Sequence, residues 1–291
     1  MNLGLDGAQR QLVDAVAKSE AAAAPGASGW EVFDALGLAD LLVPEPGGRP
    51  LLGTLEWCLV LEELGAGCRS HAEIRSVRTF LDVFAADGRP AAAAFRAWAA
   101  GQRAMPAADG VLVRRTAGGG WRIAAALPSM SGALTGPVGL DPTAARAVDD
   151  RELLVLAAYA CGVARQCLES AQQRAGRRVV AGRRLLEHQG TGHRIARCAV
   201  DLTLARVGLW RAALGEDTGE RAGHRAPAAA AACLSAALDC ADAVVQVFGA
   251  AGTSDPHVVR LFRAAGALPG ELGSPRRLWH EAGERRLALP I

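Results

Sequence analysis

The stretch RRVVAGRRLLEHQ, Arg177 to Gln189, carries four arginines in thirteen residues around a central Gly182. The whole chain is nearly neutral, with a formal net charge of +2 over 291 residues. The arginines could therefore face water, a nucleic acid or a phosphate group. Taken alone, the stretch fits a solvated basic helix end with Gly182 in a turn, since cations suit a helix C-terminus.

The composition favours helices. Hydrophobic residues make up 51% of the chain and aromatic residues only 4%, so the core must consist mainly of Ala, Leu and Val. Alanine has the highest helix propensity, and we expect a mainly α protein. The small net charge gives no general electrostatic reason to bind nucleic acid or an anionic membrane. Lys18 is the only lysine, which indicates that Arg is used here as the general basic residue.

Targeting and metal signals are weak. The start MNLGLDGAQR lacks the basic and apolar regions of a signal peptide, and no uncharged apolar run reaches the ~18 residues of a membrane span. The seven cysteines are odd in number and form no CxxC, which favours free thiols in a reducing cytoplasm. His280, Glu281 and Glu284 share a predicted helix without an HExxH motif, so we expect no metal site.

The periodicity divides the chain into three parts: an N-terminal helical domain over 1–105, a reduced β region over 106–148 and a C-terminal helical bundle over 149–291. In the middle part, GVLVRRT and WRIAAAL flank the glycine run 118–120, which predicts a hairpin. Helix returns at Asp149 and continues as a bundle of four or five helices. Thr54 is the expected N-cap of a helix that ends near Gly65.

Four stretches together resemble the acyl-CoA dehydrogenase family. LGLADLLVPEPGG (36–48) and LEWCLVLEELG (55–65) are similar to the family's "LGLLGLLVPEEYGG" and "LELALVLEELG". RRVVAGRRLLEHQ (177–189) is similar to "ERKxFGKxLxEHQ", and QVFGAAG (246–252) to "QxxGGxG". They occur in the family's order and at about its spacing. The resemblance covers roughly residues 1 to 68 and 149 to 291, but not the middle.

The resemblance implies FAD as cofactor. In the family, the Arg matching Arg178 reaches across a subunit interface to the FAD pyrophosphate. The residues matching Gln189, Gln246 and Gly249 contact the same adenosine-diphosphate part. The chemistry is reasonable, because a guanidinium fork matches phosphate oxygens and Gly lets the backbone approach a ligand closely. One departure is that Ala181 stands where the family has a Phe that helps hold the cofactor.

The family reaction removes the α-proton of an acyl-CoA with a carboxylate base while a hydride passes to the flavin. In the late segment ELGSP, Ser274 takes the place of the family's Thr and is assigned to the cofactor-binding set. Leu272 then occupies one family base position, and Glu271 is a poor substitute because a one-residue offset turns a side chain by about 100°. The isovaleryl-type position falls on Glu152, our candidate base. Glu152 could equally be an acidic residue that favours a first helical turn.

The short β region implies a partner. The family's β domain is more than twice this size and carries a "TEPxAGSD"-like word for the flavin and substrate, which this sequence lacks. The ending LGSPRRLWHE (272–281) resembles "LFGSPAxHR" of the short subunits of heteromeric bacterial acyl-CoA dehydrogenases of the steroid or polyketide type. This implies an FAD shared with a full-length homologue in a heterotetramer, or with a second copy in a homodimer. The substrate would be an acyl-CoA or an acyl-carrier-protein thioester.

Two other functions remain open at this point. The missing flavin word and the retained Glu152 fit a non-redox biosynthetic enzyme, such as an isomerase, dehydratase or cyclase, on the same scaffold. The chain could also be a non-catalytic structural subunit. In that case Glu152→Gln would change nothing, and Arg178→Ala would disrupt the complex.

Overall fold

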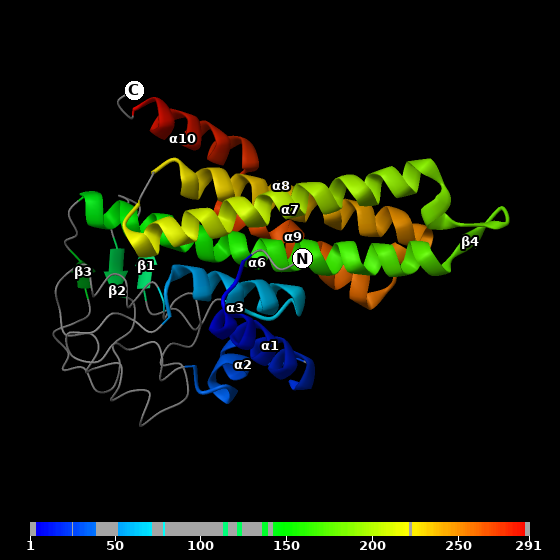
Figure 1. Cartoon of the computed structure of the whole chain (residues 1–291), viewed down its shortest axis with the longest axis horizontal. Helices are drawn as coiled ribbons and strands as arrows, with labels where there is room; N and C mark the ends of the chain where they lie inside the picture. Colours follow the sequence, from blue (N-terminus) through cyan, green and yellow to red (C-terminus); the bar gives the residue numbers. More distant parts are fainter. Residues whose placement is uncertain are drawn as a thin grey trace.

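A computed structural model describes residues 4–24, 26–38, 52–71, 78, 113–115, 121–123, 136–138, 142–220 and 223–288. The fold is mainly helical, as predicted (Figure 1). The helices are α1 (Gly7–Ala22), α2 (Gly29–Ala35), α3 (Thr54–Ala66), α6 (Pro142–Arg177), α7 (Gln189–Thr218), α8 (Arg225–Phe248), α9 (Pro256–Leu272) and α10 (Pro275–Leu287), with 3-10 turns η3 (Leu185–Glu187) and η4 (Gly249–Thr253). The predicted helices over 71–86 and 90–101 lie almost wholly outside the described residues.

The long helices α6, α7 and α8 run side by side, and α9 and α10 complete a five-helix bundle (Figure 1). The predicted helix start at Asp149 is wrong, because α6 begins at Pro142. Proline suits the first turn of a helix, where its missing N–H removes no hydrogen bond. The earlier start makes α6 36 residues long, about 54 Å at 1.5 Å per residue.

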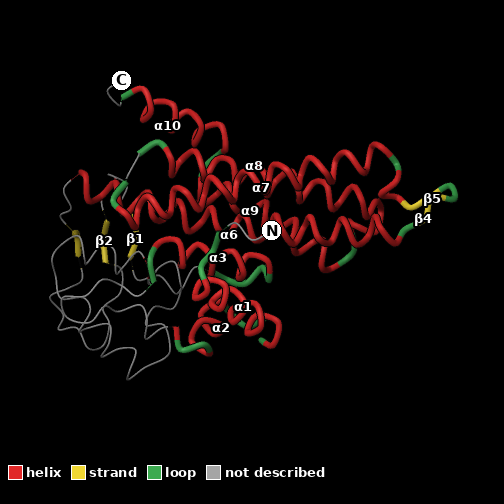
Figure 2. The backbone as a smooth tube through the Cα atoms, in the orientation of Figure 1, coloured by secondary structure: helices red, strands yellow, loops and turns green. Residues whose placement is uncertain are grey.

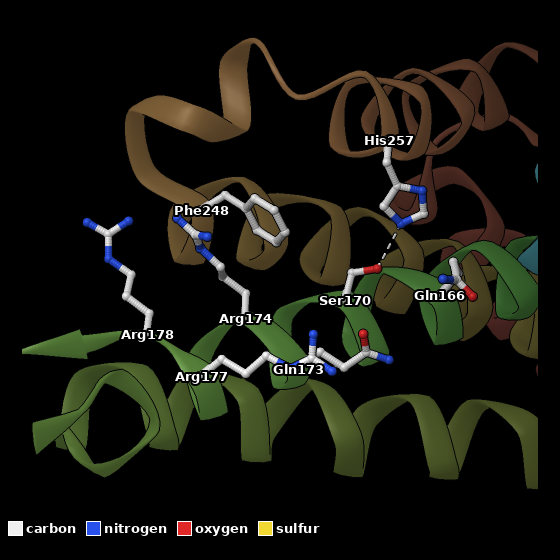
Figure 3. Close-up of a pocket in the computed structure, with 8 residues that line it drawn as sticks. All are labelled: Gln166, Ser170, Gln173, Arg174, Arg177, Arg178, Phe248 and His257. Carbon is white, nitrogen blue, oxygen red and sulfur yellow. Dashed lines mark hydrogen bonds between the residues drawn. The ribbon is translucent and has the colours of Figure 1, made fainter.

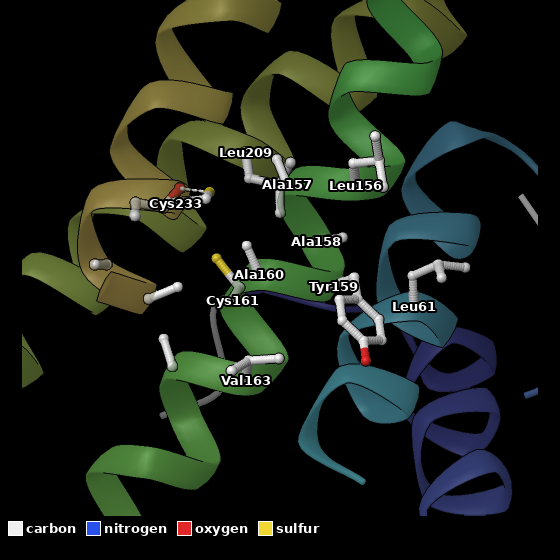
Figure 4. Packing of buried hydrophobic residues seen from close by; sticks show 14 of the residues in the cluster. Leu61, Leu156, Ala157, Ala158, Tyr159, Ala160, Cys161, Val163, Leu209 and Cys233 are labelled. Carbon is white, nitrogen blue, oxygen red and sulfur yellow. Dashed lines mark hydrogen bonds between the residues drawn. The ribbon is translucent and has the colours of Figure 1, made fainter. Parts of the chain in front are cut away.

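Helix α3 crosses α6 at close range through two glycines. A Cβ on Gly162 would overlap the carbonyl oxygen of Glu62, and a Cβ on Gly65 would overlap the carbonyl oxygen of Tyr159. Figure 4 shows α3 beside α6, with Leu61 and Tyr159 between them and small side chains such as Cys161 in the core. The glycines therefore let the N-terminal domain dock directly onto the bundle backbone.

The N-terminus of α3 is capped from a distant part of the chain. The carboxylate of Asp217, near the end of α7, accepts hydrogen bonds from the N–H groups of Thr54 (2.7 Å) and Leu55 (3.0 Å). The predicted N-cap Thr54 is wrong, since the cap position is Gly53 and the capping oxygens come from Asp217. A capping carboxylate also suits the positive end of the helix dipole.

The predicted hairpin of the middle region is confirmed. Strand β1 (Val113–Arg115) pairs antiparallel with β2 (Trp121–Ile123), with Arg115 opposite Trp121. A third strand, β3 (Gly136–Val138), pairs with β2 and was not predicted. The glycine turn and the rest of this region lie outside the described residues. The domain boundaries at 105 and 148 stay a prediction.

A second, two-stranded hairpin follows α6 and projects from the end of the bundle (Figure 2). Its strands are β4 (Val179–Val180) and β5 (Arg183–Arg184). The two turn residues, Ala181 and Gly182, have φ angles of 47° and 76°, as a type I′ turn requires. Gly182 is thus confirmed as a turn residue.

Among the described residues, two helices are long and apolar enough to cross a membrane by length and composition: α6, and α8 together with η4. Their most apolar windows are 78% and 61% buried inside the molecule. This is how core helices of a bundle behave, so composition alone is weak evidence for a membrane span.

Candidate functional site

A cleft of about 420 Å³ opens at the hairpin end of the bundle, between the C-terminal parts of α6 and α8 and the start of α9 (Figure 3). Its lining is polar and basic apart from one aromatic ring. The residues are Gln166, Ser170, Gln173, Arg174, Arg177, Arg178, Phe248 and His257.

Helix α6 supplies most of the cleft through one face. Gln166, Ser170, Arg174 and Arg178 recur every four residues, a spacing that places helical side chains next to one another. The helix ends at Arg177, and the N–H of Arg178 still donates to the carbonyl of Arg174 at 2.9 Å. The carbonyl of Arg178 then accepts from the N–H of Leu185 at 2.7 Å, which fixes Arg178 at the base of the hairpin.

The described part of the chain gives the three cleft arginines no acidic partner. Among the described residues, no carboxylate forms an ion pair with Arg174, Arg177 or Arg178. The guanidinium of Arg174 lies over the Phe248 ring at 5.2 Å, and its buried Nε has no hydrogen-bond acceptor. Buried polar groups are normally paired, so this orphan donor and its two neighbours fit an anionic ligand.

The inner wall holds a Ser–His pair. The Ser170 Oγ and His257 Nε2 atoms are 2.9 Å apart, and His257 lies in the first turn of α9 (Figure 3). Burial, and then the nearby Arg260, lower the pKa of His257 below its ordinary 6.5, so the imidazole is neutral at pH 7. The positive end of the α9 dipole adds to the field that favours an anion.

One of the predicted cofactor residues lines the cleft, and two others lie within two residues of Phe248, which also lines it. Arg178 lines the cleft, exposed Gln246 is in the last turn of α8, and Gly249 is the C-cap of that helix with a φ of 64°. Gln189 begins α7 at the foot of the hairpin. Ser274 lies apart from them, because its Oγ caps α10 by accepting from the Arg277 N–H at 3.2 Å. Their cofactor contacts stay a prediction.

The two candidate bases lie away from the cleft. Glu152 is half-buried on α6, about 25 residues before Arg177, which corresponds to about 38 Å along the helix. Glu271 is exposed at the end of α9, with an oxygen 3.2 Å from Nε2 of His71. Leu272, at the family base position, is 5% exposed and offers no acid. Neither glutamate shares a site with the arginines in one chain.

A second charged cluster is closed on itself inside the fold. Glu62 is 1% exposed, and Nε of Arg206 lies 2.8 Å and Nε of Arg165 lies 3.9 Å from its Oε1. Arg165 also donates to Glu63 at 2.7 Å. Burial raises the pKa of Glu62 even though the two arginines act to lower it. This cluster joins α3, α6 and α7 and leaves no charge free for a ligand.

Several cleft residues were missed from the sequence. Arg174 and Ser170 could have been found by extending the four-residue spacing backwards from Arg178 along the helix. His257 comes from another helix, and no local pattern pointed to it. No group of three His, Cys, Asp or Glu side chains that could hold a metal ion occurs in the part of the chain that the structure describes.

Comparison with known proteins agrees with this architecture. Residues 149–274 match the family model "Acyl-CoA dehydrogenase, C-terminal domain". The ChsE4–ChsE5 complex from Mycobacterium tuberculosis superimposes with a TM-score of 0.76 at 19% identity, over 100% of both chains. A variant of the Tcur3481–Tcur3483 steroid ACAD gives a TM-score of 0.73 at 20% identity, over 96% of this chain and 97% of that one.

A third structure, the FAD complex of PigA, gives a TM-score of 0.64 at 15% identity, over 99% of this chain and 100% of the other. At these identities the structures establish the fold alone. The overall fold is therefore that of acyl-CoA dehydrogenases, and residues 149–274 match the C-terminal domain of that family.

Proposed function

We propose that the chain is a subunit of an FAD-dependent acyl-CoA dehydrogenase complex, in which its arginine cleft binds the diphosphate of FAD. One observation carries this proposal: Arg174, Arg177 and Arg178 line one cleft, no carboxylate of the described residues pairs with them, and the buried Arg174 Nε lacks an acceptor. A diphosphate supplies several acceptor oxygens and a negative charge in one group. Guanidinium forks are well matched to such oxygens.

The residues around the arginines suit this cofactor. Gln246 and Gly249 lie within two residues of Phe248, which lines the cleft, and an amide and an exposed backbone can hydrogen-bond an adenosine moiety. When bound, the flavin supplies the hydride acceptor for α,β-dehydrogenation. The residues of this chain would bind and orient the diphosphate end of the cofactor.

A partner chain is part of the proposal. About 38 Å of helix separates Arg177 from Glu152, so one chain cannot present its cleft and its candidate base to the same cofactor and substrate. The hairpin beside the cleft exposes Val179 by 63% and Val180 by 39%, as an apolar contact surface would. We assign this surface to a larger homologue that carries a complete flavin-binding β domain. The ChsE4–ChsE5 structure is likewise described as a complex of two proteins.

The role of Glu152 is a separate part of the proposal. It would take the α-proton of an acyl thioester at the opposite end of the bundle from the cleft. Replacement by Gln keeps the size and removes the base. If Glu152 is the base, Glu152→Gln abolishes turnover in the assembled complex while flavin content stays unchanged. Unchanged turnover would leave this chain with cofactor binding alone.

The main experiment is an absorbance spectrum from 300 to 550 nm of the chain purified alone and after co-expression with a full-length acyl-CoA dehydrogenase from the same source. The proposal predicts a stoichiometric flavin band only for the complex, and its loss in Arg178→Gln. Arg183→Gln is the matched control, because Arg183 is an exposed arginine of the same hairpin outside the cleft. A complex that lacks flavin, or keeps it in Arg178→Gln, would contradict the proposal.

A further inference from the structure

Helices α7 and α8 bring two cysteines side by side. Cys198 on α7 and Cys240 on α8 are far apart in sequence, yet their side chains hydrogen-bond to each other. The Cys198 Sγ atom also lies 3.8 Å from the carbonyl oxygen of Asp239, the residue directly before Cys240. A disulfide needs two thiols that already face each other on neighbouring backbones, and this pair has that placement.

The two thiols differ in how readily they lose their protons. The hydrogen bond with Cys240 lowers the pKa of the Cys198 thiol below its ordinary 9.0, although burial and two nearby aspartates oppose this shift. The same hydrogen bond, and then burial, raise the pKa of Cys240. Because the thiolate is the nucleophile, Cys198 is the residue that reacts first with an oxidant, and Cys240 keeps its proton.

The pair lies close to the surface of the bundle. Cys198 is 4% exposed, while Cys240 is fully buried behind it. One turn before Cys198, Arg194 Nη1 lies 2.9 Å from Oδ2 of Asp242, which follows Cys240 by two residues, and both of these charged side chains are exposed. Exposed ion pairs are weak and open readily, so a small oxidant has a short path to the Cys198 sulfur.

A second pair of cysteines provides a contrast within the same chain. Cys161 on α6 and Cys233 on α8 also hydrogen-bond to each other, but both are fully buried in the core. The hydrogen bond and burial raise the pKa of Cys161 well above 9.0. Buried thiols that keep their protons are inert. The two pairs therefore have similar contacts and different expected reactivity.

We propose that Cys198 and Cys240 form a reversible disulfide when the chain meets hydrogen peroxide. The Cys198 thiolate attacks one peroxide oxygen, the O–O bond breaks and hydroxide leaves, which gives a sulfenic acid. The Cys240 thiol then attacks this sulfur, the S–O bond breaks and water leaves. In total, two thiols are oxidised to one disulfide while one hydrogen peroxide is reduced to two water molecules.

The disulfide locks α7 to α8 near the arginine cleft. Cys240 precedes Phe248, which lines the cleft, by eight residues, or about 12 Å along the helix. The bond uses only thiols of this chain, so it forms with or without flavin and does not depend on the proposed cofactor role.

The test exposes the purified chain to hydrogen peroxide, blocks the remaining thiols with iodoacetamide in denaturant, and identifies joined tryptic peptides by mass spectrometry. The expected product joins Cys198 to Cys240, disappears after dithiothreitol and is absent in Cys240→Ala and in Cys198→Ala. Cys233→Ala is the matched control, because Cys233 lies on the same helix and in the same tryptic peptide as Cys240. That variant should keep the crosslink, and Cys161 should stay reduced in the wild type.

The melting temperature is a second readout. The crosslink should raise it by a few degrees in the wild type and in Cys233→Ala, because it restricts the unfolded chain. Circular dichroism before oxidation checks that each variant folds. The proposal is overturned if Cys198 stays reduced, becomes a sulfinic acid without a crosslink, or joins Cys233 instead. A fall in the melting temperature that dithiothreitol reverses would also overturn it.

Discussion

Two sets of arginines in the bundle differ in what neutralises them. Arg165 and Arg206 lie where α3 crosses α6 and α7, and both are held by Glu62. Arg174 lies on the same helix as Arg165, about two and a half turns further on, and Arg178 directly follows the end of that helix. Neither has an acidic partner among the described residues. The residue type is the same in both sets. Only the residues packed around it distinguish an arginine that stabilises the fold from one that is available to a ligand.

The difference follows from position in the bundle. In the middle, helix α3 brings two glutamates against α6, so the charges are closed off. At the hairpin end, α8 and α9 bring an aromatic ring and a neutral imidazole instead. Variants of each set test this comparison: those at Arg206 and Gly162 should lower stability, and that at Arg174 should lower FAD affinity.

The largest expected effect is a loss of stability when an arginine paired with Glu62 is replaced. Arg206→Met leaves Glu62, which is 1% exposed, with its nearest compensating charge removed. Removing one partner of a buried ion pair costs about 3–5 kcal/mol, and we expect a loss of unfolding free energy near 3 kcal/mol at pH 7. Urea denaturation measures it. Arg197→Met, on the exposed face of α7, is the control and should change stability by less than about 0.5 kcal/mol.

The loss in Arg206→Met should shrink at low pH. The pKa of Glu62 is raised above its unfolded value, so between the two values the folded state binds the proton more strongly. Stability from this group therefore rises as the pH falls through the raised pKa and approaches 4.5. Protonation also removes the charge that Arg206 balanced. A deficit as large at pH 5 as at pH 8 would contradict an ionised Glu62.

The next effect concerns the close contact between α3, which carries Glu62, and α6. Gly162→Ala places a Cβ against the Glu62 carbonyl, and overpacking of this kind costs about 1–3 kcal/mol. Gly266→Ala is the matched control, because Gly266 is a helical glycine of α9 with open space around it. That variant should gain about 0.5–1 kcal/mol, since Ala favours helix over Gly. Equal effects of the two in urea denaturation would show that the close crossing is not needed.

Replacing a cleft arginine should lower FAD affinity and leave stability almost unchanged. Arg174→Gln should change the free energy of unfolding by no more than about 0.5 kcal/mol, because no carboxylate depends on it. It should lower the affinity for FAD about tenfold or more, since a hydrogen bond to a charged group contributes about 1.5–3 kcal/mol. Calorimetric titration and urea denaturation of the same preparation give both values. A destabilised variant with unchanged FAD affinity would place Arg174 with the structural set.

The smallest effect is the pH dependence of FAD binding. Because the pKa of His257 lies below 6.5, its proton is absent at pH 7 and bound only in more acid solution. The added charge faces the diphosphate, whose own charge is constant in this range. Affinity should rise roughly threefold at low pH, as a partly exposed charge pair contributes about 0.2–1 kcal/mol. His257→Gln should bind FAD with no such rise, and a rise in that variant would assign the effect elsewhere.

Features set by local chemistry were predictable from the sequence. The glycine run and alternating residues gave the β1–β2 hairpin, and the apolar periodicity gave the long helices. Arg178 was found from the motif around it. Features that depend on tertiary contacts were not predictable. The cap of α3 comes from Asp217, more than 150 residues away, and His257 reaches Ser170 from another helix.

The same limit applies to the arginines. RRVVAGRRLLEHQ shows four basic side chains, but only the fold shows that Arg178 joins Arg174 in a cleft without an acid while Arg183 lies outside it. Glu152 was found as an acid at a family position. Its distance from the cleft follows from the uninterrupted helix between Glu152 and Arg177. The wrong start at Asp149 does not change this distance, because both residues follow Asp149.

The most direct test of the central claim is a calorimetric titration of the purified chain with ADP and with riboflavin, in wild type, Arg178→Gln and Arg183→Gln. The arginine cleft is expected to bind ADP and not riboflavin, because its donors match the diphosphate and not the flavin ring. Binding of ADP should be lost in Arg178→Gln and kept in Arg183→Gln. Riboflavin binding as tight as ADP, or ADP binding that survives in Arg178→Gln, would contradict a diphosphate site at this end of the bundle.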